Sequence, residues 1–106
     1  MKESLNQLGQ EILEINRNNG WKVCTPDDWG DHYKLCTMIA LIHSEASEGL
    51  EAIRNQDKIN FAEEMADTLI RVLDCACGLG IDMDREVAAK LDKNKLRGIR
   101  HGGKAV

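Results

Sequence analysis

The sequence has one proline, few aromatic side chains and no excess of positive charge, and each shortage excludes a class of protein. Only 4% of the 106 residues are aromatic. Together with abundant Glu, Lys, Leu and Ala, this composition favours helices over strands. The formal net charge is −4, whereas a protein that binds nucleic-acid polymers normally carries a basic footprint. We therefore expect an all-α protein that does not bind DNA or RNA.

Long apolar runs and paired C-x-x-C motifs are also missing. No apolar stretch is long enough to span a membrane, and the N-terminal residues MKESLNQLGQ lack the apolar core of a signal peptide. The four cysteines (Cys24, Cys36, Cys75 and Cys77) do not have the spacing of a structural zinc site. Free, mostly buried thiols are the simpler interpretation, and we expect a cytoplasmic protein without membrane contact.

The hydrophobic periodicity predicts four helices, at about residues 2–18, 31–54, 60–77 and 82–96. Ser4 has the spacing of a capping box with Gln7, and so has Asn60 with Glu63. The turn around Pro26 reads as a short helical segment in the first loop. Because the last helix is expected to end before position 98, residues 98–106 are expected to form a flexible tail.

Short connections between long helices favour an antiparallel bundle of four main helices, here within a single domain of residues 1–106. The segment 60–77 is apolar around most of its circumference. A helix that is apolar on several sides must be covered on several sides. We therefore expect oligomerisation, to a homodimer or a homotetramer, to complete the bundle.

Two helices each carry a pair of acidic residues three positions apart. Glu45 falls within the apolar face of the segment 31–54, and Glu48 lies at its border. Glu64 and Asp67 have the same spacing on the next helix. Four acids in a confined space would repel one another, but a hard divalent cation such as Mg²⁺ removes that objection.

A simpler interpretation of these acids stays open at this point. Acidic residues near the start of a helix stabilise its dipole, and Glu63 needs no role beyond capping. Asp67, Arg71 and Asp74 also form a stripe of charged residues along one helix face, and this stripe could simply be exposed to solvent. The pattern therefore permits a metal site without requiring one.

Basic and aromatic residues supply candidate ligands for a nucleotide. Lys90, Asn94 and Arg97 are spaced to lie along one helix face, where they suit a polyphosphate chain or balance the helix dipole. Trp21, in a loop, is a candidate for stacking on a nucleobase, although such a residue is more often a core anchor. Two glycines precede Lys104 and would let it reach over a bound triphosphate.

Three stretches together resemble the all-α nucleoside triphosphate pyrophosphohydrolases of the MazG type. They are LIHSEASEGLEAIR, NFAEEMADTLIRVLDCACGLGID and KLDKNKLRGIRHGGK, and the resemblance covers roughly residues 35–104. It implies metal binding by Glu45, Glu48, Glu64 and Asp67, and phosphate binding by the K-x-x-x-N-x-x-R element of residues 90–97. Ser44 stands where relatives often carry a further acid, and Gly98 where they commonly have proline.

The resemblance implies Mg²⁺-dependent hydrolysis of a nucleoside triphosphate to a monophosphate and pyrophosphate, with Mn²⁺ as a substitute cation. The cation would activate the attacking water and neutralise the leaving group. House-cleaning of the nucleotide pool is the expected role. The alternative is a non-catalytic helical interaction module that uses the acids as a docking surface. A di-iron bundle is remote, because the chain has no E-x-x-H pair.

Overall fold

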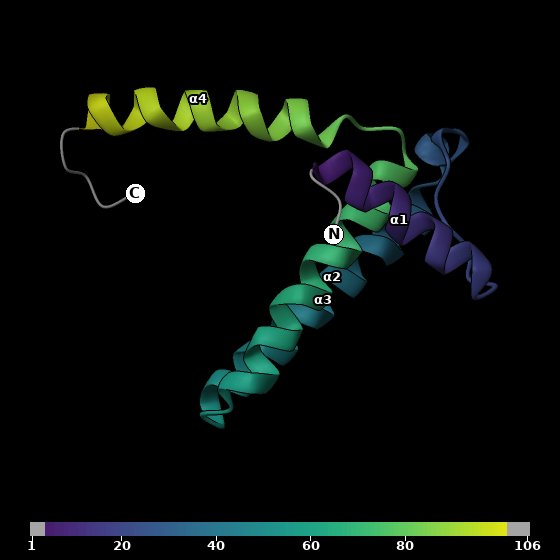
Figure 1. The fold of residues 1–106 in the computed structure, drawn as a ribbon, viewed down its shortest axis with the longest axis horizontal. Coiled ribbons are helices and arrows are strands. Elements are labelled where there is room, and N and C mark those ends of the chain that lie inside the picture. The colour runs from purple at the N-terminus through teal and green to yellow at the C-terminus, as the bar shows by residue number, and fades with distance from the viewer. Residues whose placement is uncertain (1–3, 102–106) are drawn as a thin grey trace.

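The computed structural model describes residues 4–101, and this range is helical with short connections (Figure 1). Its elements are α1 (Leu5–Asn18), the 3₁₀ helix η1 (Pro26–Gly30), α2 (His32–Arg54), α3 (Lys58–Gly78) and α4 (Met83–His101). No β-strand occurs among these described residues. The predicted all-α class is therefore confirmed.

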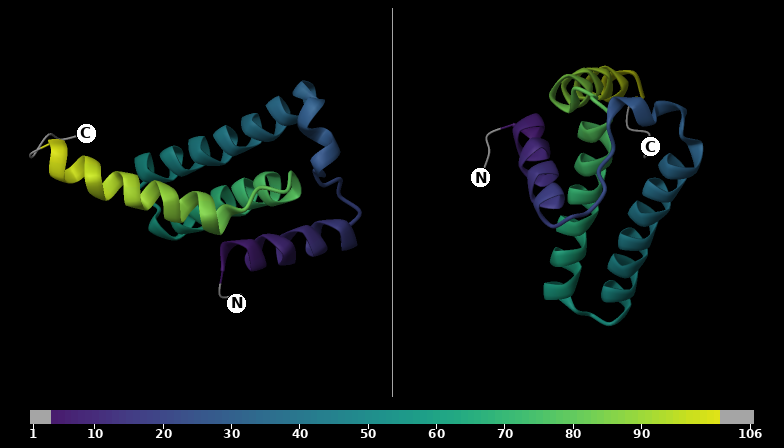
Figure 2. Two further views of the ribbon diagram at one scale, coloured as in Figure 1. Left: turned by 90° about the horizontal axis from the view of Figure 1, so that it is seen from above. Right: turned by 90° about the vertical axis from the view of Figure 1, so that its right-hand side faces the viewer.

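Helices α2 and α3 form an antiparallel hairpin, which the right-hand view of Figure 2 shows joined at its lower end. Gln56 reverses the chain there with a φ of 54°. Asp57 then caps α3, because its Oδ1 accepts a hydrogen bond from the amide of Asn60 at 3.0 Å. The expected cap at Asn60 is therefore wrong. An aspartate placed directly after the turn already satisfies that amide, so α3 begins earlier, at Lys58.

Helix α3 lies between α1 and α2, and its C-terminal half forms the core of the chain (Figure 2). Ile12 and Leu13 of α1 pack there against Leu73 and Cys77 of α3. The capping box of Ser4 and Gln7 that starts α1 is confirmed. These contacts fix α1 along the half of α3 that lies away from the hairpin turn.

The loop before α2 is anchored on the same part of α3. Cys24 is buried with Cys75 and Leu79. Gly78 makes this close approach possible, since a Cβ there would stand only 2.7 Å from the carbonyl oxygen of Cys24. The predicted helical turn at Pro26 is present as η1. All four cysteines are free, and three of them are buried, as the sequence indicated.

The start of α4 is tied to the start of α1. Asn6 donates from Nδ2 to Oδ1 of Asp82 at 2.8 Å and accepts from the Met83 amide at 2.8 Å. Asp84 accepts in turn from the Leu5 amide at 2.9 Å. Beyond this junction α4 extends away from the other helices (Figure 1). A single chain therefore does not close a four-helix bundle.

The expected end of the last helix before position 98 is wrong. Helix α4 continues through Gly98 to His101, because one glycine costs a helix only about 1 kcal/mol relative to alanine. Residues 98–101 are thus helical and not part of a tail. The predicted flap residue Lys104 lies outside the described residues.

Candidate active site

Three carboxylates converge where α2 and α3 lie side by side. Glu45 and Glu48 stand one turn apart on α2, and Glu64 faces them from α3. Each offers an oxygen, and these atoms all lie within 4.8 Å of one another. Gly49 lies at this contact: a Cβ there would stand 3.0 Å from Cε of Met65, the end of a flexible side chain, and in ordinary van der Waals contact, at 3.7 Å, with the Cβ of Glu64. Position 49 thus marks the place where α3 packs against this part of α2.

Glu64 experiences the strongest electrostatic perturbation in this group. Its side chain is buried, with 8% of its surface exposed. Its pKa is raised from 4.5 to about 7. The largest cause is a hydrogen bond with Glu48 that requires the proton, followed by burial, the negative charge of Glu48 and a second hydrogen bond with Asp67. Negative charge is therefore in excess between the two helices, which is the condition that a cation relieves.

Arg71 supplies one positive charge at the edge of the cluster. Its Nε donates to Oε1 of Glu45 at 2.9 Å. The carboxylate is 14% exposed and the guanidinium 40% exposed, so the pair is only partly shielded from water. Because this bond occupies one oxygen of Glu45, it orients the carboxylate and leaves the other oxygen for a second partner.

A cavity of about 410 Å³ opens beside these acids. Its wall combines apolar and polar side chains: Asn16, Trp21, Lys22, Met38, Leu41, Glu45, Asp67, Ile70, Arg71 and Asp74. Acidic groups thus share the wall of the cavity with a Trp ring and aliphatic side chains. A mixed lining of this kind suits a ligand that has a charged end and a flat apolar end.

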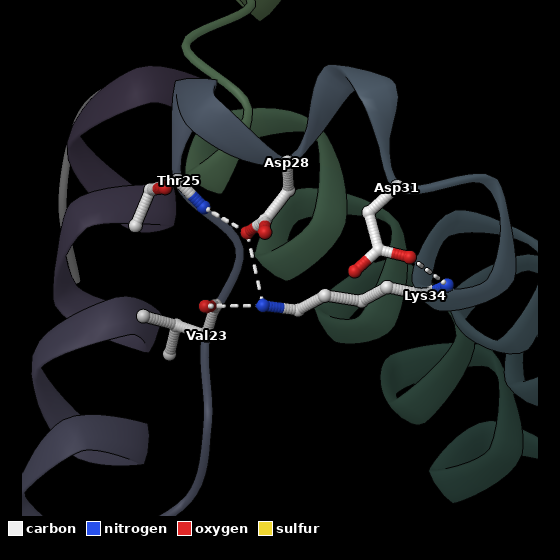
Figure 3. A network of polar contacts seen from close by, with 5 residues as sticks. All are labelled: Val23, Thr25, Asp28, Asp31 and Lys34. Carbon is white, nitrogen blue, oxygen red and sulfur yellow. Dashed lines mark hydrogen bonds and ion pairs between the residues drawn. The ribbon is translucent and has the colours of Figure 1, made fainter.

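The loop that carries Trp21 is held in place by Lys34 (Figure 3). The Lys34 ammonium donates to the Val23 carbonyl at 3.3 Å and to Oδ2 of Asp28 at 2.9 Å. Asp28 also accepts from the Thr25 amide at 2.8 Å. The hydrogen bond to Lys34 lowers the pKa of Asp28 and raises that of Lys34, so both groups keep their charges. This network joins the loop to the first turn of α2.

The structure brings together one part of the residue set that the sequence suggested. Glu45, Glu48 and Glu64 form the cluster, Asp67 contacts Glu64, and Trp21 shares the cavity with Glu45 and Asp67. Trp21 is 62% exposed and is not a core anchor. The three α4 residues Lys90, Asn94 and Arg97 are exposed and do not line the cavity.

Three residues of the site were not singled out from the sequence. Arg71 and Asp74 follow Asp67 at helical spacing, a pattern that solvent exposure explained equally well. The signal for them was the continuation of one stripe from Glu64 along α3. No signal in the sequence pointed to Asn16, because its place depends on how α1 packs against α3.

Fold and site together define an all-α protein with a carboxylate cluster beside a cavity of mixed polar and apolar lining. Residues 34–99 match the model of the MazG nucleotide pyrophosphohydrolase domain. The chain belongs to this family, which confirms the resemblance seen in the sequence. The match includes α2 from Lys34 onward and all of α3, and therefore all the clustered carboxylates. No curated protein and no solved structure matches the chain significantly.

Within residues 4–101, none of the helices combines the length and the apolar character that crossing a bilayer requires.

Proposed function

We propose that the chain hydrolyses nucleoside triphosphates to monophosphates and pyrophosphate in a reaction that depends on Mg²⁺. One observation carries this proposal: three carboxylates from two helices converge within 4.8 Å, in a chain of a nucleotide pyrophosphohydrolase family. The neighbouring cavity, of about 410 Å³, offers room for a nucleotide. Removal of unwanted nucleotides from the pool is the role that we assign to this reaction.

The donor set fits a hard divalent cation. Glu45, Glu48, Glu64 and Asp67 offer only carboxylate oxygens, which Mg²⁺ prefers and which Mn²⁺ also accepts. The hydrogen bond with Glu48, burial and the charge of Glu48 raise the pKa of Glu64 to about 7, and a cation held by these side chains would offset the negative charge. When bound, Mg²⁺ supplies positive charge that neutralises the triphosphate and its pyrophosphate leaving group.

The remaining side chains orient the substrate. Arg71 holds one oxygen of Glu45 and thereby fixes the direction in which this ligand points. Trp21 offers a flat face to the nucleobase at the cavity wall. Lys34 keeps the Trp21 loop attached to α2 through its bond to the Val23 carbonyl. Positioning of this kind contributes to the rate because it reduces the entropy lost in reaching the transition state.

A second copy of the chain would supply the phosphate-binding residues of α4. Met83, Val87 and Leu91 form an apolar stripe at four-residue intervals. The first two are partly buried, whereas Leu91 is 55% exposed. The part of the stripe near Leu91 is thus not covered by other residues of the same chain. We propose that this stripe packs on another subunit, which would bring Lys90 and Asn94 to that subunit's carboxylates.

Apolar side chains on α3 support the same assembly. Met65, Leu69 and Ile70 are each more than 40% exposed. Large apolar residues that gather on one element of a soluble protein commonly mark an interface. A homodimer, or a homotetramer built from two such dimers, would cover them.

The reaction is tested by measuring pyrophosphate release from a panel of ribo- and deoxynucleoside triphosphates with and without Mg²⁺. We expect Glu45→Gln to lower kcat/KM by at least about 100-fold, because it removes a charged cation ligand. Glu51→Gln is the matched control, since Glu51 lies on the same helix, is exposed, and within the described residues forms an ion pair with Arg54 alone, at 3.6 Å. Near-normal release by Glu45→Gln would refute the assignment. A wild-type protein inactive on every triphosphate would favour a non-catalytic interaction module.

Sharing of the site between subunits has its own test. Glu45→Gln and Arg97→Ala homo-oligomers should both be inactive, whereas an oligomer mixed from the two variants would contain some sites with neither change. In an equal mixture about half of the dimers contain one copy of each variant, and each of these has one intact site out of two. Mixing should therefore recover about a quarter of the wild-type activity. No recovery, despite proven subunit exchange, would place both residues in the site of a single chain.

A further inference from the structure

A nearly buried aspartate and a half-buried asparagine form a polar pair in the cavity wall, away from the proposed cation ligands. Asp74 of α3 is only 9% exposed, yet its side chain lines the cavity. Asn16 of α1 donates from Nδ2 to Oδ1 of Asp74 at 2.8 Å. Among residues 4–101 this is the one hydrogen bond that the Asp74 side chain makes. Within the described range no fully buried side-chain oxygen or nitrogen lacks a hydrogen-bond partner, so the second oxygen of Asp74 keeps contact with solvent and is free to accept a bond from a ligand.

The pair presents mainly hydrogen-bond acceptors to the cavity. A carboxylate accepts only, and its bond with Asn16 leaves the second oxygen available. The amide oxygen of Asn16 is also an acceptor, because the amide is oriented with its nitrogen towards Asp74. Apolar groups of Trp21 and Met38 line the same cavity. A ligand that fits this part of the wall is therefore flat and carries an N–H donor on its edge.

The spacing along α3 relates this pair to the proposed cation site. Asp67 and Asp74 are seven residues apart on one helix, which corresponds to about 10 Å along its axis. Both line the cavity. That separation is roughly the length of a nucleoside, so a nucleotide whose phosphates lie at the acidic cluster can reach Asp74 with its base.

We propose that Asp74, held by Asn16, selects nucleotides whose base carries an exocyclic amino group on its pairing edge. This inference rests on the proposed function and adds a substrate class to it. The amino group of cytosine or adenine would donate to the free oxygen of Asp74, a pairing that aspartate makes with cytosine in other settings. Uracil and hypoxanthine place a carbonyl oxygen at the same position, where two acceptors would face each other.

Two substrate pairs that differ only in this amino or carbonyl group test the proposal. With Mg²⁺, kcat/KM for CTP should exceed that for UTP by at least about tenfold, and ATP should exceed ITP by a similar ratio. In Asp74→Asn both ratios should fall below one, because the new amide, with its oxygen on Asn16, presents its NH₂ donor to the base. The new amide can still accept the bond from Asn16, so folding should survive.

Further variants separate base selection from folding and from catalysis. Asn16→Ala should also reduce the ratio of kcat/KM for CTP to that for UTP, because the Asp74 carboxylate would then be free to turn. Glu14→Gln changes an exposed residue on the same helix and should leave this ratio unchanged. Equal use of CTP and UTP by the wild type, or an unchanged ratio in Asp74→Asn, would overturn the proposal.

Binding of CMP and UMP, measured by thermal shift, distinguishes a failed inference from a failed function. If no triphosphate is hydrolysed, the proposed function is wrong. Tighter binding of CMP than of UMP that disappears in Asp74→Asn would still support base selection. Equal binding of the two monophosphates would refute it.

Discussion

Cation binding at the carboxylate cluster should compete with a proton on Glu64. The pKa of this residue is about 7 because Glu48 shares a hydrogen bond with it and because it is buried. A magnesium ligand must be ionised, so Mg²⁺ has to displace this proton. The apparent affinity for Mg²⁺ should therefore rise with pH up to about 7 and level off above it.

The raised pKa sets the size of the effect. With a value of about 7, Glu64 is about half protonated at pH 7 and about nine-tenths protonated at pH 6. The apparent dissociation constant for Mg²⁺ should then be about tenfold larger at pH 6 than at pH 8, and about twofold larger at pH 7. Glu64→Gln should bind Mg²⁺ more weakly at every pH and should lose this dependence.

The cation-free protein should show the corresponding change in stability. The pKa of Glu64 is about 7 in the folded chain, against an ordinary value of 4.5. Between these values the folded state holds a proton that the unfolded state has lost. The free energy of unfolding should therefore fall as the pH rises from about 4.5 to about 7. Glu64→Gln, which cannot ionise, should remove this loss and be the more stable protein at pH 8.

Thermal shift with MgCl₂ titrations at pH 6, 7 and 8 measures both effects. Glu63→Gln is the control, because Glu63 is exposed and lies outside the cluster. It should keep the pH dependence of the wild type. The reasoning fails if wild-type affinity for Mg²⁺ is the same at pH 6 and pH 8, or if Glu64→Gln retains the dependence.

Three further predictions concern packing, the loop and assembly. Gly78→Ala should lower the free energy of unfolding by about 1–3 kcal/mol in a denaturant titration, because its Cβ would stand 2.7 Å from the Cys24 carbonyl oxygen. Lys34→Met should raise KM for the triphosphate more than it lowers kcat in steady-state assays, since it frees the loop that carries Trp21. Leu91→Glu should shift the protein towards a monomer in sedimentation velocity, because it places a charge on the exposed end of the α4 stripe.

Most helix boundaries were predictable because local rules determine them. The capping box at Ser4 and the turn at Pro26 are present where the pattern placed them. The start of α3 was misplaced because two residues near the turn, Asp57 and Asn60, are both good caps. Only the reversal at Gln56 decides which of them stands at the helix start. The end of α4 was misplaced because a glycine weakens a helix without preventing its continuation.

The direction of α4 could not be predicted from periodicity. Its apolar stripe shows that the helix must pack on something but not which surface it meets. The reciprocal bonds between Asn6 and residues 82–83 set its direction. These bonds join positions more than 70 residues apart, and no local pattern records them.

The sequence by itself determined the helical class, the family and the acidic pairs on α2 and α3, since each depends on spacing within one helix. The tertiary structure alone decided which carboxylates meet, how far the pKa of Glu64 rises, and that Asn16 reaches Asp74. These properties depend on the distances between helices, which the packing of the helices on one another sets, as at the contact of α1 with α3. Electrostatic and hydrogen-bond energies change steeply over a few ångströms. The spacing of residues in the sequence specifies only which face of its own helix a side chain lies on, and not its distance from other helices.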